Sequence, residues 1–457
     1  MERAAPTGFD PDPTDKDRYP TLSADGHHLL SRLNQHPHAP LFRNHSGNRL
    51  TTQDVARVRA FECEVAEATE SHHPHAAPDW LMPFVARCYA EAPYFRARGK
   101  APAALIDVPP TTRADLARDI AQFVPDSAPL ERLINFRTSG ATGHPLLIAS
   151  HPVVAASYLA YHKRALRRFG IELRNGTGTV GVALLGFQRN CFTYTSVTPA
   201  MNESGFVKLN LHPDDWRDAA DRARYLDALE AEVYAGDPLS YAALLELPCR
   251  WKPRALLCTA MMLTPALRLQ LETRFNCPVV DIYSLNEAGP VAVADARAGG
   301  HVLLQHRMQV EILDDSGTAL PLGIRGEITL TGGFNFCLPL LRYRTGDYAA
   351  LELNGSESVL MDLAGRKPLR FRAAGGWLNN IEVTQALRHL PLQHYRLHQH
   401  KDGSLCFEYA AEDAPEAAIS RALHDLFGHA LPLQLSKSIF ADGKQPQYSS
   451  DMEGAIL

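Results

Sequence analysis

The strongest constraint on the fold is an alternation of short apolar segments with helical ones. Segments 179–185, 255–258 and 278–283 have the composition of buried strands. Between them, segments 216–234 and 265–275 have the length and apolar spacing of crossover helices. Parallel strands need such crossovers, so the pattern predicts an α/β sheet covered by helices on both faces. Ligands of such sheets lie beyond the carboxyl ends of the strands, so motifs that directly follow a strand carry the most weight.

The later part of the chain has a different organisation. Segments 309–313 and 326–330 predict an antiparallel β piece, since a turn-forming Asp-Asp-Ser-Gly run follows the first of them. A smaller α+β unit begins near residue 366, with helices expected at 380–390 and 415–427 and a strand at 405–409. We therefore expect a large α/β N-terminal domain with mixed or parallel sheets covered by helices, and a small mobile α+β C-terminal domain. The expected boundaries are an N-terminal arm or extension at 1–79, the large domain at 80–365 and the small domain at 366–457.

Composition excludes several classes of protein. Lys and Arg number 46 and Asp and Glu 51, so the formal charge of −5 argues against a general nucleic-acid binder. No apolar run reaches the roughly 18 residues of a membrane span, and the first residues lack the apolar core of a signal peptide. The eight cysteines are scattered without a C-x-x-C pair, which favours reduced thiols in a cytoplasmic protein. The run Ser71-His72-His73-Pro74-His75 has no carboxylate or cysteine at a useful spacing, so we favour a surface role over metal ligation.

The first chemical motif is Thr138-Ser139-Gly140-Ala141-Thr142-Gly143-His144-Pro145, which follows an apolar pair. Two glycines and three hydroxyl side chains in one turn can present consecutive backbone N–H groups to a phosphate. It is not a Walker loop, since the G-x-x-x-x-G-K-[ST] spacing is absent. An ordinary Gly/Ser/Thr turn explains the same residues equally well.

Two further motifs place carboxylates where a nucleotide could meet them. Glu287 follows a predicted strand within 283–290, a position from which a carboxylate can hold Mg²⁺ or simply cap a helix. Asp347 ends the stretch 339–347 and can accept from both ribose hydroxyls, or else pair with an arginine. In that stretch Arg342 and Arg344 are fixed cations suited to phosphate or carboxylate.

Two basic residues lie farther along the chain. Arg366 stands where the composition changes to the small unit, and Lys444 lies in a glycine-bearing loop near the C-terminus. A lysine in such a loop is usually only solvated.

The three motifs and the two basic residues make five elements. In this order along the chain, they resemble those of the adenylate-forming superfamily of acyl-CoA synthetases and adenylation domains, and most of all its phenylacetate–CoA ligase branch. The segment 138–145 is similar to the phosphate loop of the superfamily, and 283–287 to its Y-G-x-T-E segment. The stretch 339–347 is similar to the P-x-x-R-Y-R-T-G-D sequence of the branch, and 108–116 to its entry segment. The resemblance covers residues 80–457.

The resemblance implies a reaction in two halves. A carboxylate attacks the α-phosphate of MgATP to give acyl-AMP and pyrophosphate, and a thiol then displaces AMP. It assigns the residues of the phosphate loop and of the adenine and substrate region to nucleotide binding, namely Thr138, Ser139, Gly140, Thr142, Gly143, His144, Thr259, Ala260, Tyr283 and Asn286. It gives Glu287 to Mg²⁺, Asp347 to the ribose hydroxyls and Arg366 to the ribose and phosphate near a hinge. Lys444 matches the mobile lysine that bridges the carboxylate and the α-phosphate.

The acid site and the departures from the family pattern are less constrained. Phe187, Phe192, Tyr194 and Met308 fall in regions that line the acid site in relatives, where they would suit an aryl acid, and they are equally plausible as core. His144 stands where relatives usually carry lysine, Asn286 where they carry threonine, and Ala260 in a loop that is usually glycine-rich. We expect an active enzyme with a shifted substrate or acceptor.

The leading prediction is an ATP-dependent ligase that activates an aryl carboxylic acid and transfers it to CoA. One alternative is transfer to the phosphopantetheine of a carrier protein or to an amine in a secondary-metabolite pathway. An alternative of another class is a non-catalytic nucleotide-binding protein. The expected partners are the acid, ATP, and CoA or a carrier protein, with no nucleic acid, no membrane span and a possible homodimer.

Overall fold

The computed structural model describes most of the chain. The described residues are 14–68, 77–137, 146–174, 176–189, 191–261, 263, 265–364, 369–387, 390, 392, 394–410, 416–437 and 448–455.

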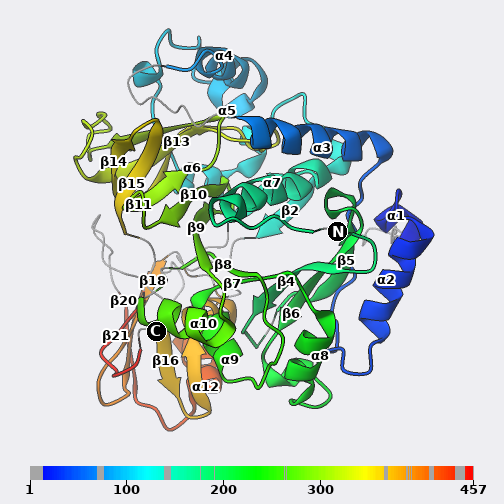
Figure 1. The fold of residues 1–457 in the computed structure, drawn as a ribbon. Coiled ribbons are helices and arrows are strands. Elements are labelled where there is room, and N and C mark those ends of the chain that lie inside the picture. Colours follow the sequence, from blue (N-terminus) through cyan, green and yellow to red (C-terminus); the bar gives the residue numbers. More distant parts are fainter. Residues whose placement is uncertain are drawn as a thin grey trace, which may run out of the picture.

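One half of the large sheet is a block of parallel strands (Figure 1). Its strands run in the order β6-β4-β7-β8-β9, and neighbouring strands are parallel throughout. Their bounds are β4 Val180–Gly186, β6 Ser204–Asn210, β7 Val233–Gly236, β8 Ala255–Cys258 and β9 Val279–Leu285. All three strands expected from the apolar segments are present, so the parallel core is confirmed. β5 (Tyr194–Thr198) is antiparallel to β6 and closes that edge.

The other half is antiparallel and continues directly from β9. Its strands are β10 Gly289–Asp295, β11 Gly300–Leu303, β12 Met308–Leu313, β13 Gly326–Gly332, β14 Leu340–Asn354 and β15 Glu357–Ala364. The predicted antiparallel piece is confirmed, since β12 and β13 pair with Val310 opposite Leu330. The short β1 (Thr111–Thr112) joins parallel to β14. A separate hairpin pairs β2 (Ile134–Arg137) with β3 (Leu147–Ser150), on either side of the expected phosphate loop.

Helices cover the sheet. α3 (Thr52–Glu67) packs along α7 (Pro152–Arg168), and both lie over the same part of the sheet (Figure 1). The remaining helices of this body are α1 Asp15–Arg18, α2 Ala24–Gln35, α4 Leu81–Glu91, α5 Pro93–Arg96, α6 Arg113–Arg118, α8 Asp221–Leu229, α9 Pro238–Leu245 and α10 Pro265–Phe275. Short 3₁₀ turns lie at Leu105–Asp107, Ile120–Phe123, Leu130–Arg132, Pro199–Met201 and Pro213–Asp215. α10 has the predicted bounds.

The helix expected over 216–234 is much shorter in the structure. α8 ends at Leu229 because Glu230 adopts a left-handed backbone conformation with φ +46°. The next apolar residues then form β7, in which Val233 and Tyr234 are fully buried. The apolar spacing of α8 runs into a continuously apolar strand, and local periodicity does not separate the two.

The described part of the N-terminal extension packs on the large body. Leu29 and Leu33 of α2 belong to the same core cluster as Val207 and Leu209 of β6. Arg43 forms an ion pair with the buried carboxylate of Asp215. We keep 1–79, 80–365 and 366–457 as proposed boundaries, although α2 shares its core with the large sheet.

The C-terminal residues form a smaller α+β unit with its own sheet and core. Its sheet has the order β20-β19-β18-β21, with β18 His394–Gln399, β19 Leu405–Ala410, β20 Leu433–Lys437 and β21 Tyr448–Ser450. The other elements are β16 Arg370–Ala373, β17 Gly376–Asn379, α11 Asn380–Leu387 and α12 Glu416–Phe427. Phe371, Phe407 and Ile419 are fully buried in a cluster confined to residues beyond 368. The α/β fold class with a small second unit is therefore confirmed.

Two further expectations concern the whole molecule. All eight cysteines are free. Among the described helices none combines the length and the apolarity that crossing a bilayer requires.

Candidate active site

The carboxyl ends of the parallel strands define the edge where a ligand is expected. β7, β8 and β9 are parallel neighbours, so their carboxyl ends lie at one edge of the sheet. Thr259 follows β8, and its N–H donates to the carbonyl of Gly236 at the end of β7 (3.0 Å). β9 runs through Tyr283 to Leu285, two residues beyond the predicted end, and a tight turn at 286–288 leads into β10. This turn carries Asn286 and Glu287 at that edge.

Two tyrosine–carboxylate hydrogen bonds join the Glu287 and Asp347 motifs. The hydroxyl of Tyr283 donates to Asp347 Oδ2 at 2.9 Å, and the hydroxyl of Tyr343 donates to Glu287 Oε1 at 2.6 Å. Each motif has a tyrosine four residues before its carboxylate, and each tyrosine binds the carboxylate of the other motif. These two hydrogen bonds join residues that lie 56 and 64 positions apart along the chain, and so hold the two motifs together.

Both phenols remain hydrogen-bond donors. Burial raises the pKa of Tyr283 and of Tyr343 well above the ordinary value. The nearby carboxylate charge raises each pKa further, chiefly that of Asp347 for Tyr283 and that of Glu287 for Tyr343. The two hydroxyls therefore stay protonated across the pH range in which an enzyme is assayed, and they hold two carboxylates in fixed positions.

The entry segment 108–116 supplies a cation to the same place. Thr111 and Thr112 pair with Tyr343 and Arg344 of β14, and the Thr111 hydroxyl donates to the carbonyl of Leu341 at 2.9 Å. Arg113, which begins α6, is thereby placed with Nη1 4.0 Å from Glu287 Oε1. The sequence singled out this segment without giving it a role, because nothing local indicates that it would dock beside β14.

Aromatic packing supports the Glu287 turn. Tyr158 of α7 donates its hydroxyl to the carbonyl of Asn286 at 2.9 Å. Its ring meets Phe334 edge to face, with centroids 5.0 Å apart. Gly289 lies beneath this pair with φ +75°, and a Cβ there would come within 2.6 Å of the Phe334 ring. Sequence reasoning missed Tyr158 and Phe334; the Gly289-Pro290 pair beside Glu287 was the one local signal of close packing.

The arginines of the 339–347 stretch stabilise the fold. Arg342 is 2% exposed, pairs with Glu311, and donates to the carbonyls of Ile106, Val108 and Gly317. Arg344 pairs with Glu327, which also accepts from the N–H of Gly346 at 2.8 Å. Both arginines therefore bind carboxylates inside the fold, which are one of the two kinds of partner expected for them.

The residues expected in the acid site lie on different parts of the large sheet. Phe187 follows β4 and packs on the cluster that contains the parallel strands, while Phe192 contacts Tyr194 edge to face at 5.5 Å. Phe192 is 53% exposed, so it is no part of a closed wall. Met308 is buried in a different cluster, with the antiparallel strands. Of these four residues, Phe192 and Tyr194 are in contact, and the structure places Phe187 and Met308 in different clusters.

The remaining predicted residues lie after β8 or outside the described part of the chain. Ala260 is exposed directly beyond β8, with φ +73°. Thr138, Ser139, Gly140, Thr142, Gly143, His144, Arg366 and Lys444 lie outside the described residues.

The chemistry of the Glu287 surroundings fits a magnesium ion. Mg²⁺ prefers oxygen ligands, and carboxylates most of all. Tyr343 holds Oε1 of Glu287, which fixes the plane of the carboxylate and hence the direction of Oε2. Arg113 adds positive charge on the same side, as a polyphosphate requires.

Comparison with known proteins bears on this arrangement. No family model matches the chain. A phenylacetate-coenzyme A ligase of Aromatoleum evansii is 29% identical over 167 residues, which make up 35% of this chain and 38% of that relative. The chain thus spans under two fifths of the length of the curated relative that it matches. Among solved structures, 2-hydroxyisobutyryl-CoA ligase with 2-HIB-AMP and CoA in the thioesterification state is 16% identical, with a TM-score of 0.52. The match covers 87% of this chain and 90% of that one.

The chain has the fold of the adenylate-forming superfamily. The resemblance drawn from the five motifs is confirmed at the level of the fold. In this adenylate-forming fold, the Glu287 turn and the Asp347 strand meet at the carboxyl edge of the parallel block. The roles of the individual side chains remain predictions.

Proposed function

We propose that the protein is an ATP-dependent, AMP-forming ligase that activates a carboxylic acid and passes the acyl group to a thiol. In the first half-reaction a carboxylate oxygen attacks the α-phosphorus of ATP and pyrophosphate leaves. In the second, the thiol sulfur attacks the acyl carbon and AMP leaves. The observation that supports this proposal most is the reciprocal pairing of Tyr283 with Asp347 and of Tyr343 with Glu287.

The first half-reaction brings two anions together, so positioning and fixed positive charge must supply most of the catalysis. In the proposal, Asp347 accepts from the ribose hydroxyls, and Tyr283 holds the carboxylate in place for them. Arg113 faces the polyphosphate from beside Glu287. The loop at 138–145 binds pyrophosphate oxygens, Arg366 binds the ribose and phosphate near the hinge, and Lys444 bridges the attacking carboxylate and the α-phosphate.

Glu287 would hold Mg²⁺, which, when bound, neutralises negative charge on the phosphate oxygens. The contribution of this chain is the orientation of that carboxylate by Tyr343 and the rigidity of the turn that carries it. Tyr158 and Phe334 provide this rigidity from the neighbouring helix and loop.

CoA is the acceptor that we favour, since both similar proteins are described as CoA ligases. For the acid we favour an aryl carboxylic acid, which the contacting rings of Phe192 and Tyr194, and the ring of Phe187 after β4, would suit. Transfer to a carrier protein or an amine is the alternative within the same chemistry. A non-catalytic nucleotide-binding protein is disfavoured, because the two carboxylates are held in place as an active site requires.

The test is ATP–pyrophosphate exchange by the purified protein over a panel of aryl and alkyl acids. We expect exchange that depends on the acid, and CoA-dependent release of AMP once the acid is found. In the Lys444→Ala variant exchange should fall by about 10²–10³-fold, as for the loss of one preorganised donor. Lys437→Ala removes an exposed lysine of β20 in the same domain and should leave exchange unchanged.

The outcomes separate the hypotheses. If AMP is not released when CoA is added, but is released on addition of an amine or of a carrier protein with a free phosphopantetheine thiol, the acceptor is the alternative one. No exchange with any acid, together with tight ATP binding by calorimetry, would favour the non-catalytic protein and contradict the proposal.

A further inference from the structure

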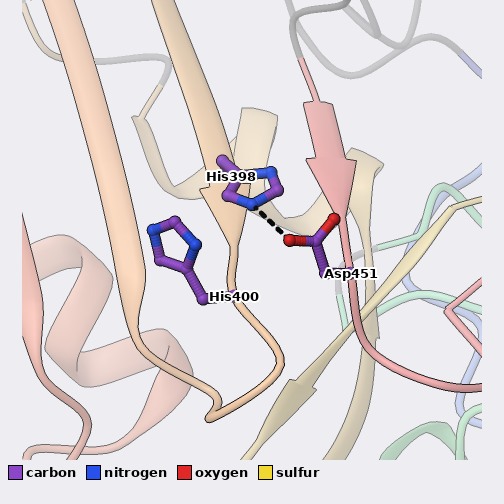
Figure 2. A group of neighbouring side chains, drawn as sticks. All are labelled: His398, His400 and Asp451. Atoms are coloured by element: carbon purple, nitrogen blue, oxygen red, sulfur yellow. Dashed lines mark hydrogen bonds and ion pairs between the residues drawn. The ribbon is translucent and has the colours of Figure 1, made fainter.

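A cluster of metal-ligating side chains lies in the small C-terminal unit, away from the Glu287 and Asp347 motifs. Among the described residues, His398, His400 and Asp451 are the group whose ligand atoms all lie within 4.8 Å of one another. His398 is the last residue but one of β18, His400 follows that strand, and Asp451 follows β21. Figure 2 shows His400 and Asp451 on either side of the His398 ring.

The sheet places these residues on one face. β18 and β21 are parallel neighbours, with His398 opposite Ser449. Residues two apart on a strand point to the same side, so His398 and His400 face the same way, as do Ser449 and Asp451. The N–H of Asp451 donates to the carbonyl of Gln399 at 2.9 Å, which extends the ladder and fixes the backbone at Asp451.

The backbone between the two histidines is held rigidly. The side chain of Gln399 is fully buried on the opposite face. Its amide nitrogen donates to the carbonyl of Arg372 at 2.7 Å, and its amide oxygen accepts from the N–H of Arg372 at 2.7 Å. Beyond the strand, the N–H of His400 donates to the carbonyl of Ser404. Ligands carried by such a backbone lose little freedom when a metal binds.

The side chains are oriented as metal ligands are. His398 Nε2 lies 3.2 Å from Asp451 Oδ2, and its Nδ1 lies 2.8 Å from Ser449 Oγ. Bonds of roughly 2.0–2.1 Å in a tetrahedral zinc site put neighbouring ligand atoms about 3.3 Å apart, which matches the Nε2–Oδ2 distance. With Nδ1–H donated to Ser449, the lone pair of Nε2 faces the metal, which is the usual arrangement of a ligating histidine with a hydrogen-bond partner behind it.

We propose that His398, His400 and Asp451 form a binding site for a divalent transition metal such as Zn²⁺, with water as a fourth ligand. Two imidazole nitrogens and one carboxylate oxygen suit Zn²⁺ better than Mg²⁺ or Ca²⁺, which prefer all-oxygen sets. His400 is exposed, and its ligand atom lies within 4.8 Å of those of the other two, so rotation of its side chain would complete the set. The metal links β18 to the chain that leaves β21 and stabilises the small unit. The simpler interpretation is an ion pair between His398 and Asp451.

Calorimetric titration of the chelator-stripped, full-length protein with ZnCl₂ distinguishes the two interpretations. We expect about one Zn²⁺ per chain and a rise in melting temperature with added Zn²⁺. Both effects should be lost in His400→Gln and in Asp451→Asn. Ser449→Ala should weaken binding by about 10–100-fold, as the loss of a partner behind a ligand does. Co²⁺ in place of Zn²⁺ should give the strong visible absorption of a four-coordinate ion.

Two multiple variants serve as controls. The double variant His424→Gln, His429→Gln removes two other histidines of the same domain, whose rings lie 5.9 Å apart, and should bind Zn²⁺ like the wild type. The triple variant His72→Gln, His73→Gln, His75→Gln removes the histidine-rich run of the N-terminal extension and should do the same. Unchanged Zn²⁺ binding in His400→Gln, or binding lost in either control, would overturn the proposal. Melting temperatures measured without metal show that each variant is folded.

Discussion

Removing the hydroxyl of Tyr343 tests the reciprocal tyrosine–carboxylate pairing directly. Tyr343→Phe keeps the buried ring and deletes the donor that lies 2.6 Å from Glu287 Oε1. Glu287 is 5% exposed, so bulk water does not simply replace the lost donor. A hydrogen bond to a charged group contributes about 1.5–3 kcal/mol. If the proposed adenylation depends on that carboxylate, the same free energy appears as a roughly 10- to 150-fold slower reaction.

The assay is acid-dependent ATP–pyrophosphate exchange, with kcat and KM for ATP measured separately, and urea unfolding in parallel. We expect the loss mainly in kcat, because the hydroxyl positions Glu287 rather than contacting the adenosine. Tyr225→Phe is the matched control: its buried hydroxyl donates to the carbonyl of Leu33 at 2.7 Å, in the core cluster of α2. That variant should lose about 1 kcal/mol of stability and keep full exchange. If Tyr343→Phe loses stability but exchanges as fast as wild type, the pairing serves packing alone and our reasoning is wrong.

Three further substitutions test the electrostatics of the fold. Burial raises the pKa of Asp281 to about 6, so the wild type loses stability as the pH rises from about 4 to 6. Replacing the carboxyl in Asp281→Asn should therefore regain up to about 3 kcal/mol of stability at pH 7 but nothing below pH 4. Hydrogen bonds from Arg297, and to a lesser extent from Arg168, lower the pKa of Asp295. Asp295→Asn should therefore reduce the free energy of unfolding by about 1.5–3 kcal/mol at pH 7, measured in the same urea titrations. Arg342→Ala should cost about 3–5 kcal/mol, because it leaves Glu311 buried without its partner, and the folded fraction should keep the KM for ATP of wild type. A stable Arg342→Ala protein with weakened ATP binding would instead assign Arg342 to a phosphate.

The parts of the fold that were predicted correctly are those encoded by adjacent residues. β8 is predicted by an unbroken run of apolar residues. α10 is predicted by its apolar spacing and by the proline at its first position. β14 was not recognised as one strand, because Gly346 has φ +79° and its pairing with β13 shifts register twice. A left-handed glycine next to an aspartate has the sequence of a turn, and only the partner strand keeps the backbone extended beyond it.

The candidate site divides in the same way. The sequence predicted two carboxylates for the site, Glu287 after a strand and Asp347 after a glycine turn. It did not indicate that each tyrosine binds the carboxylate of the other motif, since 56 and 64 positions separate the partners. Arg342 shows the limit most clearly. Its residue type suits an anion such as Glu311, but two of the three carbonyls that it also binds belong to residues more than 230 positions earlier in the chain.

At two of the departures from the family pattern, Asn286 and Ala260, the structure shows what the backbone does. At Asn286 the contact with Tyr158 is made by the backbone carbonyl, which any residue supplies, so replacing the usual threonine leaves the support of the turn intact. At Ala260 the departure has a cost: φ is +73°, a conformation that a glycine adopts freely and that costs any other residue roughly 1–2 kcal/mol. Strain of this kind persists where the surrounding structure enforces it, and it gathers at functional sites. Ala260 therefore has the left-handed backbone that a glycine would adopt freely, which argues that this conformation directly after β8 is what the protein requires.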